Sequence, residues 1–167
     1  MAINYPHLMA AAKTVLVTSG WVGDETGRQR LILNLEIDGV IVEGLTLRMT
    51  SNRTMPDRKV TVQIEHKPPG SIVVPLCRLE WRPIRSHRNY QRGPKEFRLQ
   101  EIEGTHLHSF ESNWLESEQR MLTDNLPIAI PISPDPEGFH QLLALVSKEF
   151  RIVNAADIPM PPWDLLL

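Results

Sequence analysis

The chain has 167 residues, of which 41% are hydrophobic and 23% are charged, as in ordinary globular domains. Its formal net charge of −2 argues against a general nucleic-acid coat, so any anion must be bound locally. The single cysteine, Cys77, excludes an internal disulfide and predicts a reducing, cytoplasmic location. No stretch contains the roughly 20 apolar residues that a membrane span needs, so we expect no membrane association.

This length predicts one domain, residues 1–167, with room for a sizeable core. The fourteen prolines favour strands and loops over a helical bundle. A short helix is expected from Pro6 to Lys13, since proline is accepted in a first helical turn. The segment that follows, 14–18, is rich in β-branched residues and can either extend this helix or begin a strand.

Strand patterning begins after a turn-rich loop. Four segments alternate apolar and polar residues, which is typical of antiparallel strands with one buried and one solvated face. These segments are 31–37, 45–50, 60–65 and 72–81. Asp38-Gly39, after the first of them, predicts a hairpin turn.

The last of these strands carries charged residues on its solvated side. They are Arg78, Glu80 and Arg82. Two further strands are expected at 97–102 and 105–110, separated by Glu103-Gly104. Segment 112–125 is polar and weakly helical, and 128–132 predicts a short strand bounded by prolines.

The clearest helix lies near the C-terminus. Asp135-Pro136 is a favourable start, because an N-cap aspartate is followed by proline at the first helical position. Apolar residues then recur on one face, at Phe139, Leu142, Leu143, Val146 and Phe150. The sequence therefore predicts an α+β fold, with a curved, mainly antiparallel β-sheet, a short N-terminal helix and a C-terminal amphipathic helix (roughly 136–150) packed on the sheet.

A basic stretch is the strongest functional signal. From Arg78 to Arg98 there are seven basic and two acidic residues. Arginine presents a fork of donors that matches phosphate or carboxylate oxygens. The expected anion-binding residues are Arg82, Arg85, Arg88 and Asn89. The plain alternative is a solvated surface loop.

Three histidines accompany these arginines. His106 and His108 are two residues apart, so on a strand both rings project from one face. With His87 they are the candidate catalytic residues, since imidazole transfers protons near neutral pH. The alternatives are a metal site, with Glu111 or His87 as a further ligand, and two strand histidines without a role. The favoured interpretation needs neither metal nor cofactor.

The order of these motifs resembles a known family. His87-Arg88-Asn89, then Gly104-Thr105-His106-Leu107-His108, then a closing helix that ends in Phe150-Arg151-Ile152 are similar to an uncharacterised prokaryotic domain family. That family has a His-Arg-Asn … Gly-Pro-His-x-His core and distantly resembles the TumE-like toxins of toxin–antitoxin systems. The resemblance covers 72–153 and departs from the pattern at Thr105, where proline is expected. It implies a role in toxin–antitoxin or phage-related loci, with an antitoxin-like protein as partner.

Three functions are therefore expected in order of preference. The first is a metal-independent ribonuclease-like or toxin-like phosphoryl-transfer enzyme, in which His106 and His108 act as acid and base on RNA or another phosphate-bearing ligand. The second is a non-catalytic module that binds nucleic acid or an acidic partner through the basic loop. The third is a metal-binding protein that uses His106 and His108.

Overall fold

The computed structural model describes residues 3–164 and confirms an α+β fold built on an open, antiparallel sheet. The strands of this sheet are β1 (Thr14–Leu16), β2 (Val22–Gly23), β3 (Arg28–Ile37), β4 (Val40–Asn52), β5 (Val60–His66), β6 (Val74–Trp81), β9 (His106–His108) and β10 (Ile130–Pro131). Their order is β1-β3-β4-β5-β6-β9-β10, and β2 pairs with β3. The segment 14–18 thus begins a strand, which pairs with β3.

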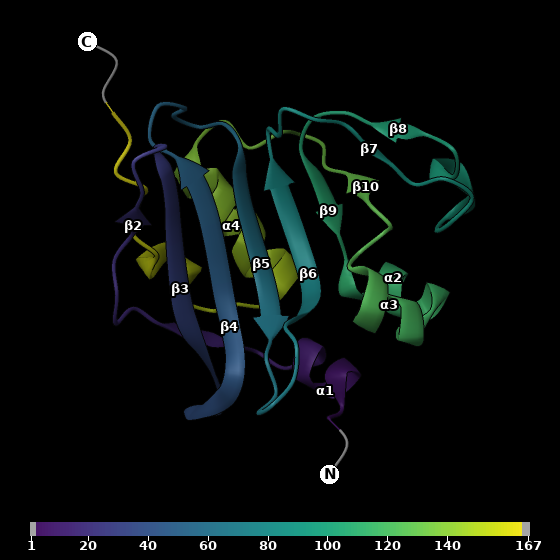
Figure 1. Ribbon diagram of the computed structural model, residues 1–167, viewed down its shortest axis with the longest axis horizontal. Helices are drawn as coiled ribbons and strands as arrows, with labels where there is room; N and C mark the ends of the chain where they lie inside the picture. Colours follow the sequence, from purple (N-terminus) through teal and green to yellow (C-terminus); the bar gives the residue numbers. More distant parts are fainter. Residues whose placement is uncertain (1–2, 165–167) are drawn as a thin grey trace.

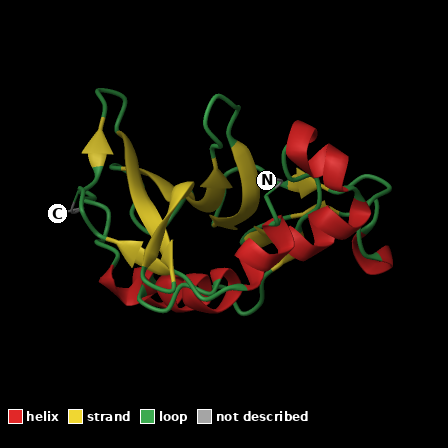
Figure 2. Ribbon diagram, turned by 90° about the horizontal axis from the view of Figure 1, so that it is seen from below, coloured by secondary structure: helices red, strands yellow, loops and turns green. Residues whose placement is uncertain are grey.

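One face of the sheet is covered and the other is not. The helices are α1 (Tyr5–Ala10), α2 (Phe110–Glu116), α3 (Glu118–Asp124) and α4 (Phe139–Phe150), with 3-10 turns at Lys95–Phe97 and Ala155–Asp157. Figure 1 shows α4 behind strands β3 to β6, whereas no helix lies in front of them. Seen from below, α4 runs along one side of the arched sheet (Figure 2). We call the side of β3 to β6 and β9 that faces away from α4 the open face.

The covered face carries the hydrophobic core. Along one row of the sheet, paired residues from six strands point to this face: Leu31, Met49, Val62, Leu79, Leu107 and Ile130. All but the last are buried, and the apolar face of α4 packs on the same core cluster. Burying apolar surface contributes roughly 25 cal/mol per Å² and is the main force that fixes the register of these strands.

The C-terminal helix begins at Phe139 and not at 136. The carboxylate of Asp135 does not cap it, because that group accepts a hydrogen bond from Arg82 Nε at 2.6 Å. Gly138 is extended and takes the N-cap position instead. Arg82 directly follows β6 in the chain, and the sequence around the helix does not reveal that it binds Asp135.

Most of the expected strands 97–102 and 105–110 are not strand. Pairing is limited to β8 (Glu101–Ile102), at the end of the first segment, and to β9, in the middle of the second, and β8 forms a small separate hairpin with β7 (His87–Arg88). Leu99 has a left-handed φ of 61°, which a strand does not accommodate. Ser109 caps α2 by accepting from the Ser112 backbone N–H, so the chain turns helical directly after β9.

Within residues 3–164, no helix combines the length and the hydropathy that crossing a lipid bilayer requires.

Candidate functional site

The edge of the open face brings the histidine pair beside two charged residues of β6. Strand alternation puts Leu107 into the core and turns His106 and His108 to the open face. The antiparallel register pairs His106 with Glu80 and His108 with Arg78. Directly paired residues have Cβ atoms about 5 Å apart, so these four side chains are immediate neighbours.

A third ring joins them from the β7–β8 hairpin. The centroid of His87 lies 4.7 Å from that of His108 and 5.8 Å from that of His106. The centroids of His106 and His108 are 5.2 Å apart. The three histidines that the sequence singled out therefore form one cluster, although His87 lies in a different sheet.

Backbone carbonyls determine which ring nitrogens carry hydrogen. His106 Nδ1 lies 2.8 Å from the Gly104 carbonyl oxygen, and His87 Nε2 lies 2.9 Å from the Pro127 carbonyl oxygen. A carbonyl only accepts, so each of these nitrogens is an N–H donor. In the neutral rings the opposite nitrogens, His106 Nε2 and His87 Nδ1, then carry free lone pairs.

Arg78 supplies the positive charge within the cluster. Its Nη2 donates to His108 Nε2 at 3.4 Å, its Nε lies 3.1 Å from Glu80 Oε1, and its Nη1 donates to Asn125 at 3.5 Å. Burial lowers the pKa of the Arg78 guanidinium, and the Glu80 carboxylate opposes that shift. A single guanidinium group thus bridges a carboxylate and an imidazole at the edge of the open face.

The two strand histidines are buried and stay neutral. His106 is 2% exposed and His108 is 0% exposed. Burial, and after it the charge of Arg78, hold the pKa of His108 well below its ordinary value. Burial also lowers the pKa of His106, against the opposing effect of the Gly104 carbonyl. Nδ1 of His108 is buried and lacks a hydrogen-bond partner among the described residues.

The donor set matches a transition-metal site. Glu80, His106 and His108 each offer one ligand atom, and these atoms lie within 4.8 Å of one another. Ligand atoms around a four-coordinate zinc ion are roughly 3.4 Å apart, so an ion would draw the groups about 1 Å closer. Two histidines and one carboxylate suit zinc or ferrous iron. Glu111, the other ligand predicted from sequence, lies exposed on α2 beside Leu107, which points to the covered face.

The expected anion-binding arginines do not join the histidine cluster. Arg82 is held by Asp135 and donates from Nη2 to the Pro136 carbonyl at 2.9 Å. Arg85 and Arg88 are exposed, and the Arg88 guanidinium lies 5.8 Å from the centroid of the Tyr90 ring. The arginine that does reach the histidines is Arg78, because it lies directly opposite His108 in the pairing of β6 with β9.

Asn89, which was predicted to bind an anion, is buried and has a structural role. It is 0% exposed, and its side-chain amide accepts from the Ala129 backbone N–H at 2.8 Å and donates to the Ala129 carbonyl at 2.7 Å. Asn113 makes the same pair of bonds with the backbone of Ile128. These two amides tie the β7–β8 hairpin and α2 to the segment before β10, and so position His87.

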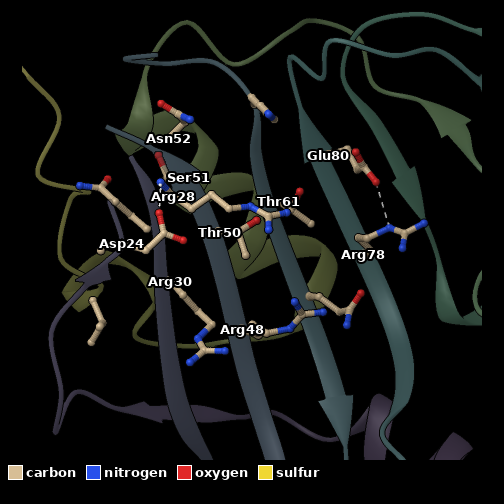
Figure 3. Close-up of a pocket in the computed structure, with 15 residues that line it drawn as sticks. Asp24, Arg28, Arg30, Arg48, Thr50, Ser51, Asn52, Thr61, Arg78 and Glu80 are labelled. Carbon is tan, nitrogen blue, oxygen red and sulfur yellow. Dashed lines mark hydrogen bonds and ion pairs between the residues drawn. The ribbon is translucent and has the colours of Figure 1, made fainter. Parts of the chain in front are cut away.

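A hollow that the sequence did not predict adjoins the cluster. It has a volume of about 590 Å³, lies on the open face of β3 to β6, and includes Arg78 and Glu80 in its lining (Figure 3). Its other cationic residues are Arg28, Arg30, Arg48 and Lys59. The signal for it was present as alternation in 28–37, where Arg28 and Arg30 occupy the polar side. What was missing is the register that aligns β3 with β6.

Comparison with known proteins adds no information about this site. The chain matches no family model, no curated protein and no solved structure. The relationship to TumE-like toxins stays a prediction.

Proposed function

We propose that this protein binds a divalent transition-metal ion through Glu80, His106 and His108, with His87 as a fourth ligand. The observation that carries the proposal is the convergence of three imidazole rings and one carboxylate at the β6–β9 edge of the open face. When bound, such an ion polarises a carbonyl or phosphoryl oxygen or activates water.

The state of the rings supports ligation. Metal ions bind neutral imidazole, and burial keeps His106 and His108 neutral. Ligand histidines commonly donate their second ring nitrogen to a carbonyl or carboxylate, which sets the tautomer and the ring orientation. His106 and His87 both do so, toward the carbonyls of Gly104 and Pro127.

The cluster also has more acceptors than donors. The neutral rings of His106 and His108 each provide one lone pair and Glu80 provides a carboxylate, whereas Arg78 is the cation that contacts His108 and Glu80. A buried group of acceptors is stabilised by positive charge. We infer that Arg78 holds this place in the metal-free protein and yields it when an ion binds.

The ribonuclease-like function predicted from sequence is less well supported by this geometry. Acid–base catalysis needs a group that is protonated in part near neutral pH, and the lowered pKa values of His106 and His108 reduce the fraction of each ring that is protonated there. A ribonuclease that uses these rings as acid and base stays a prediction. RNA turnover by metal-free protein would favour the ribonuclease-like function over metal binding.

The proposal is tested by metal titration of protein purified without a histidine tag. Metal-stripped protein is titrated with Zn²⁺, Fe²⁺, Mn²⁺ and Ni²⁺ in a calorimeter, and its metal content is measured by elemental analysis. We expect one ion per chain and a loss of affinity of about 100-fold or more in His106→Gln, since even residues that only orient ligands cost 10- to 100-fold.

Two variants keep this test interpretable. Glu80→Gln removes the carboxylate with almost no change of shape, and Glu80 is partly exposed, so folding is expected to persist. His140→Gln removes an exposed histidine of α4 and is expected to leave metal affinity unchanged. Equal affinity in the wild type, His106→Gln and Glu80→Gln, or the absence of a stoichiometric site, would refute the proposal.

A further inference from the structure

We propose that the hollow on the open face is a binding site for the phosphate group of a small molecule. The residues that carry the proposal are Arg28, Arg30, Arg48 and Arg78, contributed by strands β3, β4 and β6 (Figure 3). None of the first three was a candidate from the sequence, and the basic loop that was, Arg85 and Arg88, lies elsewhere on the fold.

The sheet register arranges these residues in two neighbouring rows. One row runs across the strands through Arg48, Gln63, Arg78 and His108, and the next through Arg30, Thr50, Thr61, Glu80 and His106. Strands lie about 4.8 Å apart, so Arg30 and Glu80 are separated by three strand spacings, or about 14 Å. Each row therefore begins among arginines and ends at the histidine cluster, over a distance that suits a small molecule.

The charge of the lining calls for an anion. Five cationic and two acidic side chains line the hollow, whereas the whole chain has a net charge of −2. Arg48 is neutralised by Glu65, whose Oε2 lies 2.8 Å from Nε. Arg30 forms no ion pair or side-chain hydrogen bond with the part of the chain that the structure describes, and neither does the Arg28 guanidinium.

A phosphate group matches the excess positive charge of the hollow better than a carboxylate does. A phosphate monoester carries between one and two negative charges at neutral pH and offers three acceptor oxygens, which matches the guanidinium groups of Arg30 and of Arg28, although Arg28 also attracts the Asp24 carboxylate. The hydroxyl groups of Thr50 and Thr61 add donors between the two ends of the second row. The volume of about 590 Å³ is in the ordinary range for small-molecule sites.

The same lining argues against a nucleic-acid strand. Single-stranded nucleic acid is held by aromatic side chains that stack on bases as well as by cations. Among residues 3–164, no aromatic residue lines the hollow. Tyr90 is exposed, but on the β7–β8 hairpin beside Arg88.

The hollow and the candidate metal centre share two residues, Arg78 and Glu80. A phosphate held by Arg28 and Arg30 would direct the rest of its molecule along the rows toward this centre. This orientation rests on the metal site proposed above, whereas the binding of phosphate by the hollow does not require a metal.

Inorganic phosphate is the probe for the test. Metal-stripped protein labelled with ¹⁵N is titrated with phosphate at constant ionic strength, and the backbone amide and arginine Nε–H signals are followed by NMR. We expect saturable shifts confined to β3 to β6. Arg28→Gln/Arg30→Gln is expected to weaken phosphate binding about tenfold or more, because two charge-assisted contacts are lost.

The matched control is Arg85→Gln/Arg88→Gln, which removes the same charge from an exposed loop and is expected to leave phosphate binding unchanged. Acetate at the same ionic strength is expected to bind about tenfold more weakly than phosphate. Equal weakening in both double variants would mean that net charge alone attracts phosphate, and would overturn the proposal. Shifts that do not saturate, or acetate binding as tight as phosphate, would do the same.

Two more measurements separate this proposal from its rivals. A short single-stranded RNA that binds much more tightly than phosphate, with shifts that extend to Tyr90 and the β7–β8 hairpin, would replace the small ligand by a nucleic acid. Zn²⁺ titration of Arg28→Gln/Arg30→Gln is expected to match the wild type. Loss of metal binding in His106→Gln with phosphate binding intact would support the hollow as an independent site.

Discussion

The two faces of the central sheet differ in what holds their residues in place. On the covered face, Leu33 pairs with Leu47 and Leu47 pairs with Ile64, and each of them is 0% exposed beneath α4. On the open face, the adjacent rows are mainly polar, and the charged residues in them contact each other, as Arg48 does Glu65. The covered face is stabilised by removal of apolar surface from water, and the open face by electrostatic contacts that water weakens.

Because of this difference, the residues that stabilise the fold and the residues available for binding alternate along each strand. Adjacent residues point to opposite faces, so a strand can contribute one residue to the core and the next to a binding surface. The open face is therefore free to carry unneutralised arginines and a buried cluster of acceptors. Each of the following predictions tests this division, from the largest expected effect to the smallest.

The largest effect is expected for Leu33→Ala. Leu33 is fully buried, so truncation leaves a cavity and should lower the free energy of unfolding by about 3 kcal/mol. Its neighbour Ile32 is 41% exposed on the open face, and Ile32→Ala should cost less than about 1 kcal/mol. Urea denaturation of both variants measures the difference. Similar costs at the two positions would contradict the division between the faces.

Asn89→Ala should cost about 2 kcal/mol, because the buried backbone N–H and carbonyl of Ala129 each lose a partner. Asn34, exposed on the open face, is the matched control, and Asn34→Ala should be nearly neutral. Denaturant unfolding checks both values. The amide exchange rate of Ala129 supplies a local readout, and unchanged protection in Asn89→Ala would show that the side chain does not hold the segment before β10.

Arg78→Met should tighten metal binding about tenfold, equivalent to about 1.4 kcal/mol, since the guanidinium competes with the ion for Glu80 and His108. Arg48→Met removes a cation from the same row, two strands away, and should leave metal affinity unchanged. Calorimetric titration with Zn²⁺ compares the three proteins. Weaker binding in Arg78→Met would mean that the arginine supports the centre.

The smallest effect is expected for the pH dependence of protein stability. The pKa of His108 and that of His106 are lowered in the folded protein, so below about pH 6.5 the unfolded chain binds more protons than the folded one. Their contribution to stability is therefore present above this pH and is lost as the pH falls toward the folded pKa values. The melting temperature of metal-free protein should drop by a few degrees between about pH 7.5 and about pH 5.

His108→Gln is the control for this drop, because glutamine does not titrate. Its melting temperature should vary less over the same pH range than that of the wild type. An identical pH profile in both proteins would show that His108 does not cause the acid sensitivity.

Part of the candidate site could be predicted from the sequence, and part of it could not. His106 and His108 were predicted to share a face because a two-residue spacing on a strand requires it. Glu80 was placed on the solvated side of its strand by the same alternation, but its position opposite His106 depends on the pairing of β6 with β9. Arg82 follows the alternation of its segment, yet it lies beyond the end of β6 and binds Asp135.

The sequence by itself determined the alternating strands, the apolar face of the closing helix and the shared orientation of the two strand histidines, because each of these depends on local periodicity. Only the tertiary structure decided that Arg78 and Glu80 lie beside the histidines, that His87 reaches them from a separate hairpin, and that Arg28 and Arg30 face the same hollow. These contacts join residues that are distant in the chain, and they follow from strand order and register, which burial of the core selects over the whole sheet.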